Sequence, residues 1–184
     1  MREGVQWILY LIIGWLGIYL QAASDFLRPF LGVHPHLAPA LLICAVLQMG
    51  RARWVPLAVL WGLWQDALSA NPMGVSAASL LVVGLGLDPW KQVLLKERAW
   101  TRGFLGIVGG AIYPVLTLIL VLSRGGKPLL GWGFLVAVGV WSLSSGVLAA
   151  VLYPCIEKLT DLFAYPEVER PSIRLEREII RGRN

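Results

Sequence analysis

The sequence predicts an all-α fold: a polytopic integral membrane protein of six transmembrane helices. Three observations support this class. Only 15% of the 184 residues are charged and 57% are hydrophobic, whereas about a quarter of the residues in a soluble domain are charged. The hydrophobic residues gather in six stretches with short polar connections between them. The basic residues concentrate on one of the two sides that these stretches define.

The first two stretches differ in how clearly they predict a crossing. Val5–Ala23 has nearly the ~20 residues that a helix needs to cross the hydrocarbon core. It is longer than the apolar region of a cleaved signal peptide, so we expect it to remain in the membrane. Leu37–Met49 is short, and hydropathy alone leaves its crossing undecided.

The remaining four stretches are Trp54–Leu68, Met73–Leu87, Phe104–Leu122 and Leu129–Tyr153. The first two of these are also short, which is tolerated where protein rather than lipid surrounds the ends of a helix. The last is long enough to span the membrane with a tilt. Together they predict a helical hairpin followed by two full-length spans.

The distribution of basic residues decides the topology. If all six stretches cross and the N-terminus is cytoplasmic, the outer loops contain only Arg28, Arg124 and Lys127. The remaining 13 of the 16 basic residues then lie inside, as the positive-inside rule requires. Removing the second crossing would place Arg51 and Arg53 outside. The pattern therefore predicts six crossings with both termini cytoplasmic.

The chain divides into a transmembrane domain, residues 1–165, and a charged cytoplasmic tail, residues 166–184. The tail alternates in sign, and two interpretations stay open: a short amphipathic helix on the inner leaflet or a solvated segment. The formal net charge of +5 does not indicate nucleic-acid binding, because the basic residues follow the topology rather than forming a patch. They favour contact with anionic membrane lipids.

Tryptophans agree with a membrane location. Five lie at or near the ends of stretches, where indole rings favour the membrane interface: Trp7, Trp54, Trp90, Trp100 and Trp132. Trp61 and Trp64 share one helix face, and packing is favoured over ligand stacking for this pair.

Asp66 is a carboxylate at membrane depth, where an acid marks a site or a structural lock. The next helix is expected to begin with Asn71 as its N-cap and Pro72 in its first position. Asp66 could then accept hydrogen bonds from the unpaired N–H groups at that start. Gly74 is expected to allow close backbone approach. A structural tie is favoured, and a ligand or proton-relay role stays open.

Small residues recur at helical spacing in the last two stretches. Gly106 and Gly110 form one row, and Ser142, Gly146 and Ala150 form another. Rows of this kind allow membrane helices to pack closely, so we expect helix packing here.

The sequence indicates no catalytic, metal or cofactor site. The only histidines, His34 and His36, lie in an outer loop, and two ligands do not make a metal site. The serines of the last stretch lack a base for nucleophilic catalysis. We therefore expect a protein that is not an enzyme.

The block that contains Asp66 resembles the motif of the rod-shape-determining MreD family. Its positions in this sequence are Gly62, Asp66, Ser69, Pro72 and Gly74. The resemblance implies a bacterial inner-membrane component of the cell-elongation (rod) complex that regulates cell shape. It implies binding to MreC, and a link from the MreB filament to RodA and a class B penicillin-binding protein in peptidoglycan synthesis.

The resemblance also implies a fold like the substrate-binding S component of energy-coupling-factor transporters. The motif residues would have a structural or partner-binding role. The alternative function is an S component that captures a vitamin or a metal, which would need a polar pocket near Asp66. Against this, Val5–Ala23 lacks the alanine pair of such components. The sequence leaves open whether the protein dimerises and which helix face meets a partner.

Overall fold

The computed structural model describes residues 2–23, 36–69, 71–91, 99–125 and 131–163. Within these ranges the regular structure is helical, in agreement with the all-α prediction. The predicted tail, His34, Arg28 and Lys127 lie outside the described residues.

Each of the six predicted stretches forms a helix. Their bounds are α1 (Arg2–Ala23), α3 (Leu37–Gln48), α4 (Arg51–Leu68), α5 (Val75–Leu87), α7 (Ala99–Ser123) and α8 (Trp132–Phe163). A short 3-10 turn, η1 (Asp88–Trp90), follows α5. Among the described residues, α1, α7 and α8 are long and apolar enough to cross a membrane. The helices are therefore confirmed, and six crossings remain a prediction.

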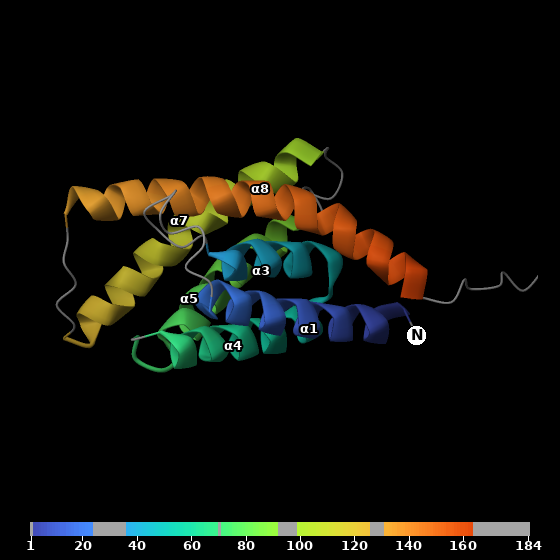
Figure 1. The fold of residues 1–184 in the computed structure, drawn as a ribbon, viewed down its shortest axis with the longest axis horizontal. Helices are drawn as coiled ribbons and strands as arrows, with labels where there is room; N and C mark the ends of the chain where they lie inside the picture. The colour runs from blue at the N-terminus through green and yellow to red at the C-terminus, as the bar shows by residue number, and fades with distance from the viewer. Residues whose placement is uncertain (1, 24–35, 70, 92–98, 126–130, 164–184) are drawn as a thin grey trace, which may run out of the picture.

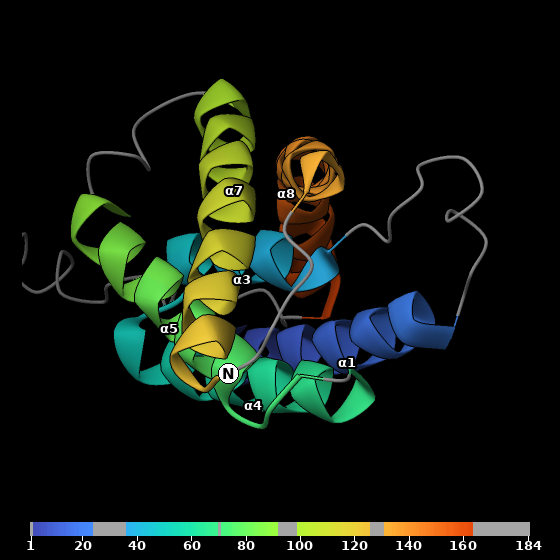
Figure 2. The ribbon, with the colours of Figure 1, turned by 90° about the vertical axis from the view of Figure 1, so that its left-hand side faces the viewer.

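Helix α3 is the core of the bundle. Residues 38–47 are all buried, and the helix contacts α1, α4, α5, α7 and α8. Figure 1 shows it between α8 on one side and α1 and α4 on the other, and Figure 2 shows the same order from the side. A helix that is apolar all round is stable only when it is surrounded. This explains how 12 residues, about 18 Å of helix, can form a central element.

Successive helices run in opposite directions. At one end of the bundle, Arg53 at the start of α4 pairs with Glu3 at the start of α1. There Gln6 also donates to Gln48, at the end of α3, over 2.9 Å. We call this the Arg53 end. The start of α1 and the end of α8 lie together on this side (Figure 1).

The opposite end, which we call the Asp66 end, collects the other helix termini. The backbone N–H of Leu37 at the start of α3 donates to Gln21 near the end of α1 over 2.9 Å. Arg124, just after α7, donates to the carbonyl of Met73, just before α5, over 3.1 Å. The chain thus returns to the same end after every second helix.

Trp54 packs entirely against protein, whereas the sequence suggested an indole ring placed at the membrane interface. Helix α4 begins at Arg51, three residues before the predicted stretch, so Trp54 lies in its first turn. The indole is fully buried against Gly84 of α5, and its Nε1–H donates to Asp88 over 3.2 Å. A buried Trp N–H needs an acceptor, and Asp88 supplies it.

Candidate functional site: the Asp66 hairpin and the α7–α8 groove

The Asp66 carboxylate caps the start of α5. Asp66 lies in the last turn of α4 and is 2% exposed. Its Oδ2 accepts the backbone N–H of Gly74 over 2.8 Å, and the N–H of Ser76 lies 3.1 Å from Oδ1 and 3.2 Å from Oδ2. These N–H groups have no partner within the helix, and a negative charge suits the helix N-terminus. The hydrogen bonds expected from the sequence are present.

The start of α5 differs from the prediction. Asn71 is not the N-cap and Pro72 is not the first helical residue, because α5 begins at Val75 and Gly74 precedes it as N-cap. Gly74 has φ of 91°, a left-handed conformation that favours glycine. The Asp66 carboxylate takes the capping role assigned to Asn71, so the chain can turn through residues 72–74 before the helix starts.

The close backbone approach occurs at Gly62, not at Gly74. A Cβ added at Gly74 would meet nothing within 4 Å. A Cβ added at Gly62 would lie 2.2 Å from the Cα of Ala77 and 2.4 Å from its nitrogen. Gly62 therefore sets the distance between α4 and α5. Ser69 ends α4, with its hydroxyl 3.4 Å from the carbonyl oxygen of Asp66.

The two rows of small residues pack against each other. A Cβ added at Gly106 would lie 2.6 Å from the Cα of Gly146, and one added at Gly110 would lie 3.0 Å from the Cα of Ser142. Ala150 lies at the edge of this contact, with its Cβ 3.9 Å from a Cβ added at Gly103. Because these residues have little or no side chain, α7 and α8 cross with their backbones almost touching (Figure 1).

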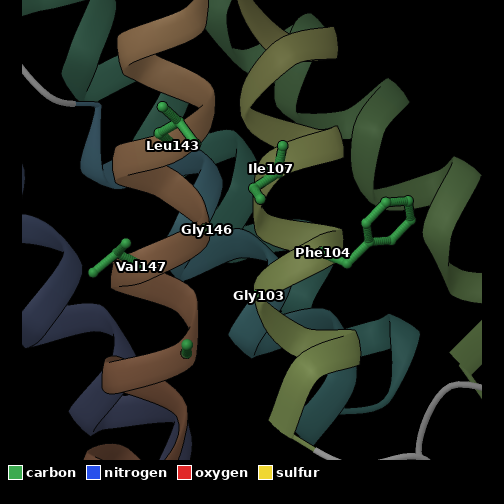
Figure 3. A pocket seen from close by; sticks show the side chains of 7 residues that line it. Gly103, Phe104, Ile107, Leu143, Gly146 and Val147 are labelled. Atoms are coloured by element: carbon green, nitrogen blue, oxygen red, sulfur yellow. The ribbon is translucent and has the colours of Figure 1, made fainter.

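An apolar groove runs beside this crossing. It has a volume of about 390 Å³ and is lined by Gly103, Phe104, Ile107, Leu143, Gly146, Val147 and Ala150. Figure 3 shows Gly103 and Gly146 between the two helices, with larger side chains extending from α7 and from α8. We call this surface the α7–α8 groove. The rows of small residues predicted the contact between the two helices but not the groove beside it.

Two serine hydroxyls of α8 are satisfied by the helix itself, whereas the buried hydroxyl of Ser145 has no hydrogen-bond partner among the described residues. The hydroxyl of Ser142 donates to the carbonyl of Val138 over 2.7 Å, and that of Ser144 to the carbonyl of Trp141 over 3.0 Å. In the part of the chain that the structure describes, no three His, Cys, Asp or Glu residues gather as a metal site would require.

Comparison with known proteins gives one finding. A family model described as "rod shape-determining protein MreD" matches residues 1–163. No curated protein and no solved structure matches the chain. The expected likeness to transporter S components therefore stays an expectation.

Proposed function

The chain belongs to the MreD family of rod shape-determining proteins, and we propose that it is a non-enzymatic scaffold of the bacterial cell-elongation complex. In this proposal it binds the transmembrane helix of MreC. It thereby links the MreB filament to the peptidoglycan synthases RodA and a class B penicillin-binding protein. Family membership supports the role in rod shape determination. The nature of the exposed helix surfaces supports a scaffold.

We further propose that all six helices cross the inner membrane with the Arg53 end in the cytoplasm. The alternating direction of the helices supports this topology. So does the clustering of basic residues at the Arg53 end, where Lys91 donates to the carbonyl of Met49 and Arg102 lies 3.8 Å from the ring centroid of Tyr153. Partial burial lowers the pKa of Lys91, against the opposite effect of Asp88. A basic end of this kind is typical of the cytoplasmic side.

The α7–α8 groove is the observation that carries the proposed partner binding. Its walls include Phe104, Leu143 and Val147, three large apolar side chains that remain mostly exposed. Lipid tails are as apolar as these side chains, so a partner helix gains mainly by closer packing than lipid achieves. A floor that contains Gly103 and Gly146 permits such an approach. No polar partner group is needed.

A groove-filling substitution tests this proposal. Val147→Trp blocks the groove from α8, where Val147 is 66% exposed, so the core is not disturbed. Val82→Trp is the matched control, because Val82 is 52% exposed on α5 and does not line the groove. We expect Val147→Trp to reduce co-purification of MreC from membranes at least about tenfold, which corresponds to ~1.4 kcal/mol, and Val82→Trp to leave it unchanged.

Thermal melting of each variant in detergent separates loss of binding from loss of folding. Two results would contradict binding in the groove. One is full recovery of MreC with Val147→Trp, and the other is an equal loss of MreC with both variants at unchanged melting temperature.

A further inference from the structure

A second cavity lies at the Asp66 end of the bundle. It measures about 260 Å³ and is lined by the residue before α3, the end of α4 and the turn after it, the second half of α7 and the first half of α8. Figure 1 shows α7 and α8 diverging toward this end. We call this cavity the Gln65 pocket, because the side chain of Gln65 lines it with a buried polar atom that has no hydrogen-bond partner in the part of the chain that the structure describes. It shares no lining residue with the α7–α8 groove.

Gln65 presents an unsatisfied acceptor. Its side chain is 8% exposed and lines the cavity. Its Nε2 lies 3.1 Å from Nδ1 of His36, but its buried Oε1 finds no hydrogen-bond donor among the described residues. A buried acceptor without a donor is unfavourable, and such groups usually have a partner. A ligand that donates an O–H or N–H would supply one.

Aromatic rings form the apolar part of the wall. The rings of Tyr113 and Trp141 both pack against His36, with centroid distances of 5.7 Å and 4.7 Å. Thr117 adds a hydroxyl, which lies 3.1 Å from that of Ser79. No Asp, Glu, Lys or Arg side chain lines the cavity in the described part of the chain. A charged ligand would find no Asp, Glu, Lys or Arg as a counter-charge there, and an unpaired buried charge is costly, so the chemistry favours a neutral ligand.

We propose that the Gln65 pocket binds one ring of a neutral carbohydrate. A ring hydroxyl donates to Oε1 of Gln65, and the C–H face of the sugar packs on the aromatic wall. A sugar ring combines these two features: hydroxyl donors around its edge and apolar faces. The volume lies near the lower end of small-molecule sites, about 300 Å³, and thus suits a single ring.

The sugar could be free in solution or be the head group of a glycolipid, since both present the same ring. The proposal does not depend on the scaffold function, because the pocket and the groove are separate surfaces.

The experiment uses the purified full-length protein in lipid nanodiscs. In one arm, saturation-transfer NMR measures binding of methyl β-D-glucoside at millimolar concentration, with methoxycyclohexane as the ring without hydroxyls. In the other arm, the nanodiscs contain monoglucosyl diacylglycerol, and native mass spectrometry counts the glycolipid retained by the protein.

Three variants are compared with the wild type in both arms. Gln65→Leu removes the acceptor. Leu118→Trp fills the pocket from α7, and Ile119→Trp is its control, because Ile119 is the next residue, is 54% exposed and does not line the pocket.

We expect binding in one arm by the wild type and by Ile119→Trp. It should be reduced about tenfold or more in Gln65→Leu and Leu118→Trp, as expected when a site built for a hydroxyl loses its partner or its space. Binding in the first arm alone identifies a free sugar, and binding in the second alone identifies a lipid head group. If Gln65→Leu does not fold, the comparison of ligand binding between Leu118→Trp and Ile119→Trp tests the proposal on its own.

Three results would overturn the proposal: no binding in either arm, equal binding of methoxycyclohexane, or binding that survives Leu118→Trp. MreC co-purification should be unchanged in Leu118→Trp, so failure here is distinguishable from failure of the scaffold proposal.

Discussion

Asp66 shows how a single charge can be accommodated in the interior of a helical bundle, where its side chain is 2% exposed. Its carboxylate accepts the N–H groups of Gly74 and Ser76, so the charge lies against the positive end of α5 rather than against lipid. A carboxylate engaged in this way has a structural explanation for its burial. These hydrogen bonds support the structural tie that the sequence favoured.

Replacing Asp66 should destabilise the hairpin. Asp66→Ala leaves the N–H groups at the start of α5 without their acceptor, and we expect the free energy of unfolding to fall by about 2–3 kcal/mol. Reversible unfolding in mixed micelles measures this. Ser69→Ala is the control, because the Ser69 hydroxyl makes two long contacts of 3.4 Å each, one to the Asp66 carbonyl and one from the backbone N–H of Asn71. Its effect should stay within about 0.5 kcal/mol. Equal stability of Asp66→Ala and the wild type would refute the capping role.

At the scale of elements, two backbone contacts decide how the helices are spaced. Gly62 brings α4 against Ala77 of α5, and Gly106 brings α7 against Gly146 of α8. In lipid, packing of this closeness replaces much of the burial energy that drives soluble proteins together. Helix α3 depends on it, since it is short and needs all of its neighbours to enclose it.

A methyl group at Gly62 should separate α4 from α5. The added Cβ would meet backbone atoms of Ala77 at 2.2 and 2.4 Å, and backbone cannot rotate away as a side chain can. We expect Gly62→Ala to lower the free energy of unfolding by about 1–3 kcal/mol. Gly86→Ala in α5 is the matched control, because its Cβ would meet nothing within 4 Å, and it should be neutral or stabilising by about 0.5–1 kcal/mol. Equal effects of the two substitutions would show that the contact does not limit packing.

At the scale of the whole molecule, the bundle has two chemically different ends. The Arg53 end joins the starts of α1 and α4 through Glu3 and Arg53. The Asp66 end contains the hairpin turn and the Gln65 pocket. Our proposed topology places the Gln65 pocket toward the outer face of the inner membrane, away from the cytoplasm.

Single-cysteine labelling tests the orientation. In a background where Cys44 and Cys155 are replaced, Asn71→Cys marks the turn at the Asp66 end and Gly50→Cys marks the Arg53 end, where an added Cβ meets nothing. We expect a membrane-impermeant maleimide to label Asn71→Cys in intact cells and Gly50→Cys only after lysis, since the basic end stays in the cytoplasm. The reverse pattern would invert the topology, and labelling of both in intact cells would exclude it.

The sequence by itself determined the features that depend on local composition and spacing. The six helical segments follow from runs of apolar residues, and the bond from Asp66 to the next helix follows from a carboxylate near a helix start. The row of Gly106 and Gly110 likewise predicted close helix packing. Each of these features depends on residues that are near in sequence or share a helix face, so each can be predicted from the sequence.

Only the tertiary structure decided which distant surfaces meet. The burial of Trp54, the partner of Gly62 and the delayed start of α5 depend on α4 lying against α5. The α7–α8 groove depends on how two helices cross, and the Gln65 pocket depends on α7 and α8 diverging beside the start of α3 and the end of α4. Such contacts form only when the chain folds into a bundle. They cannot be predicted from the sequence alone, because no local pattern of residues specifies which face of one helix packs against another.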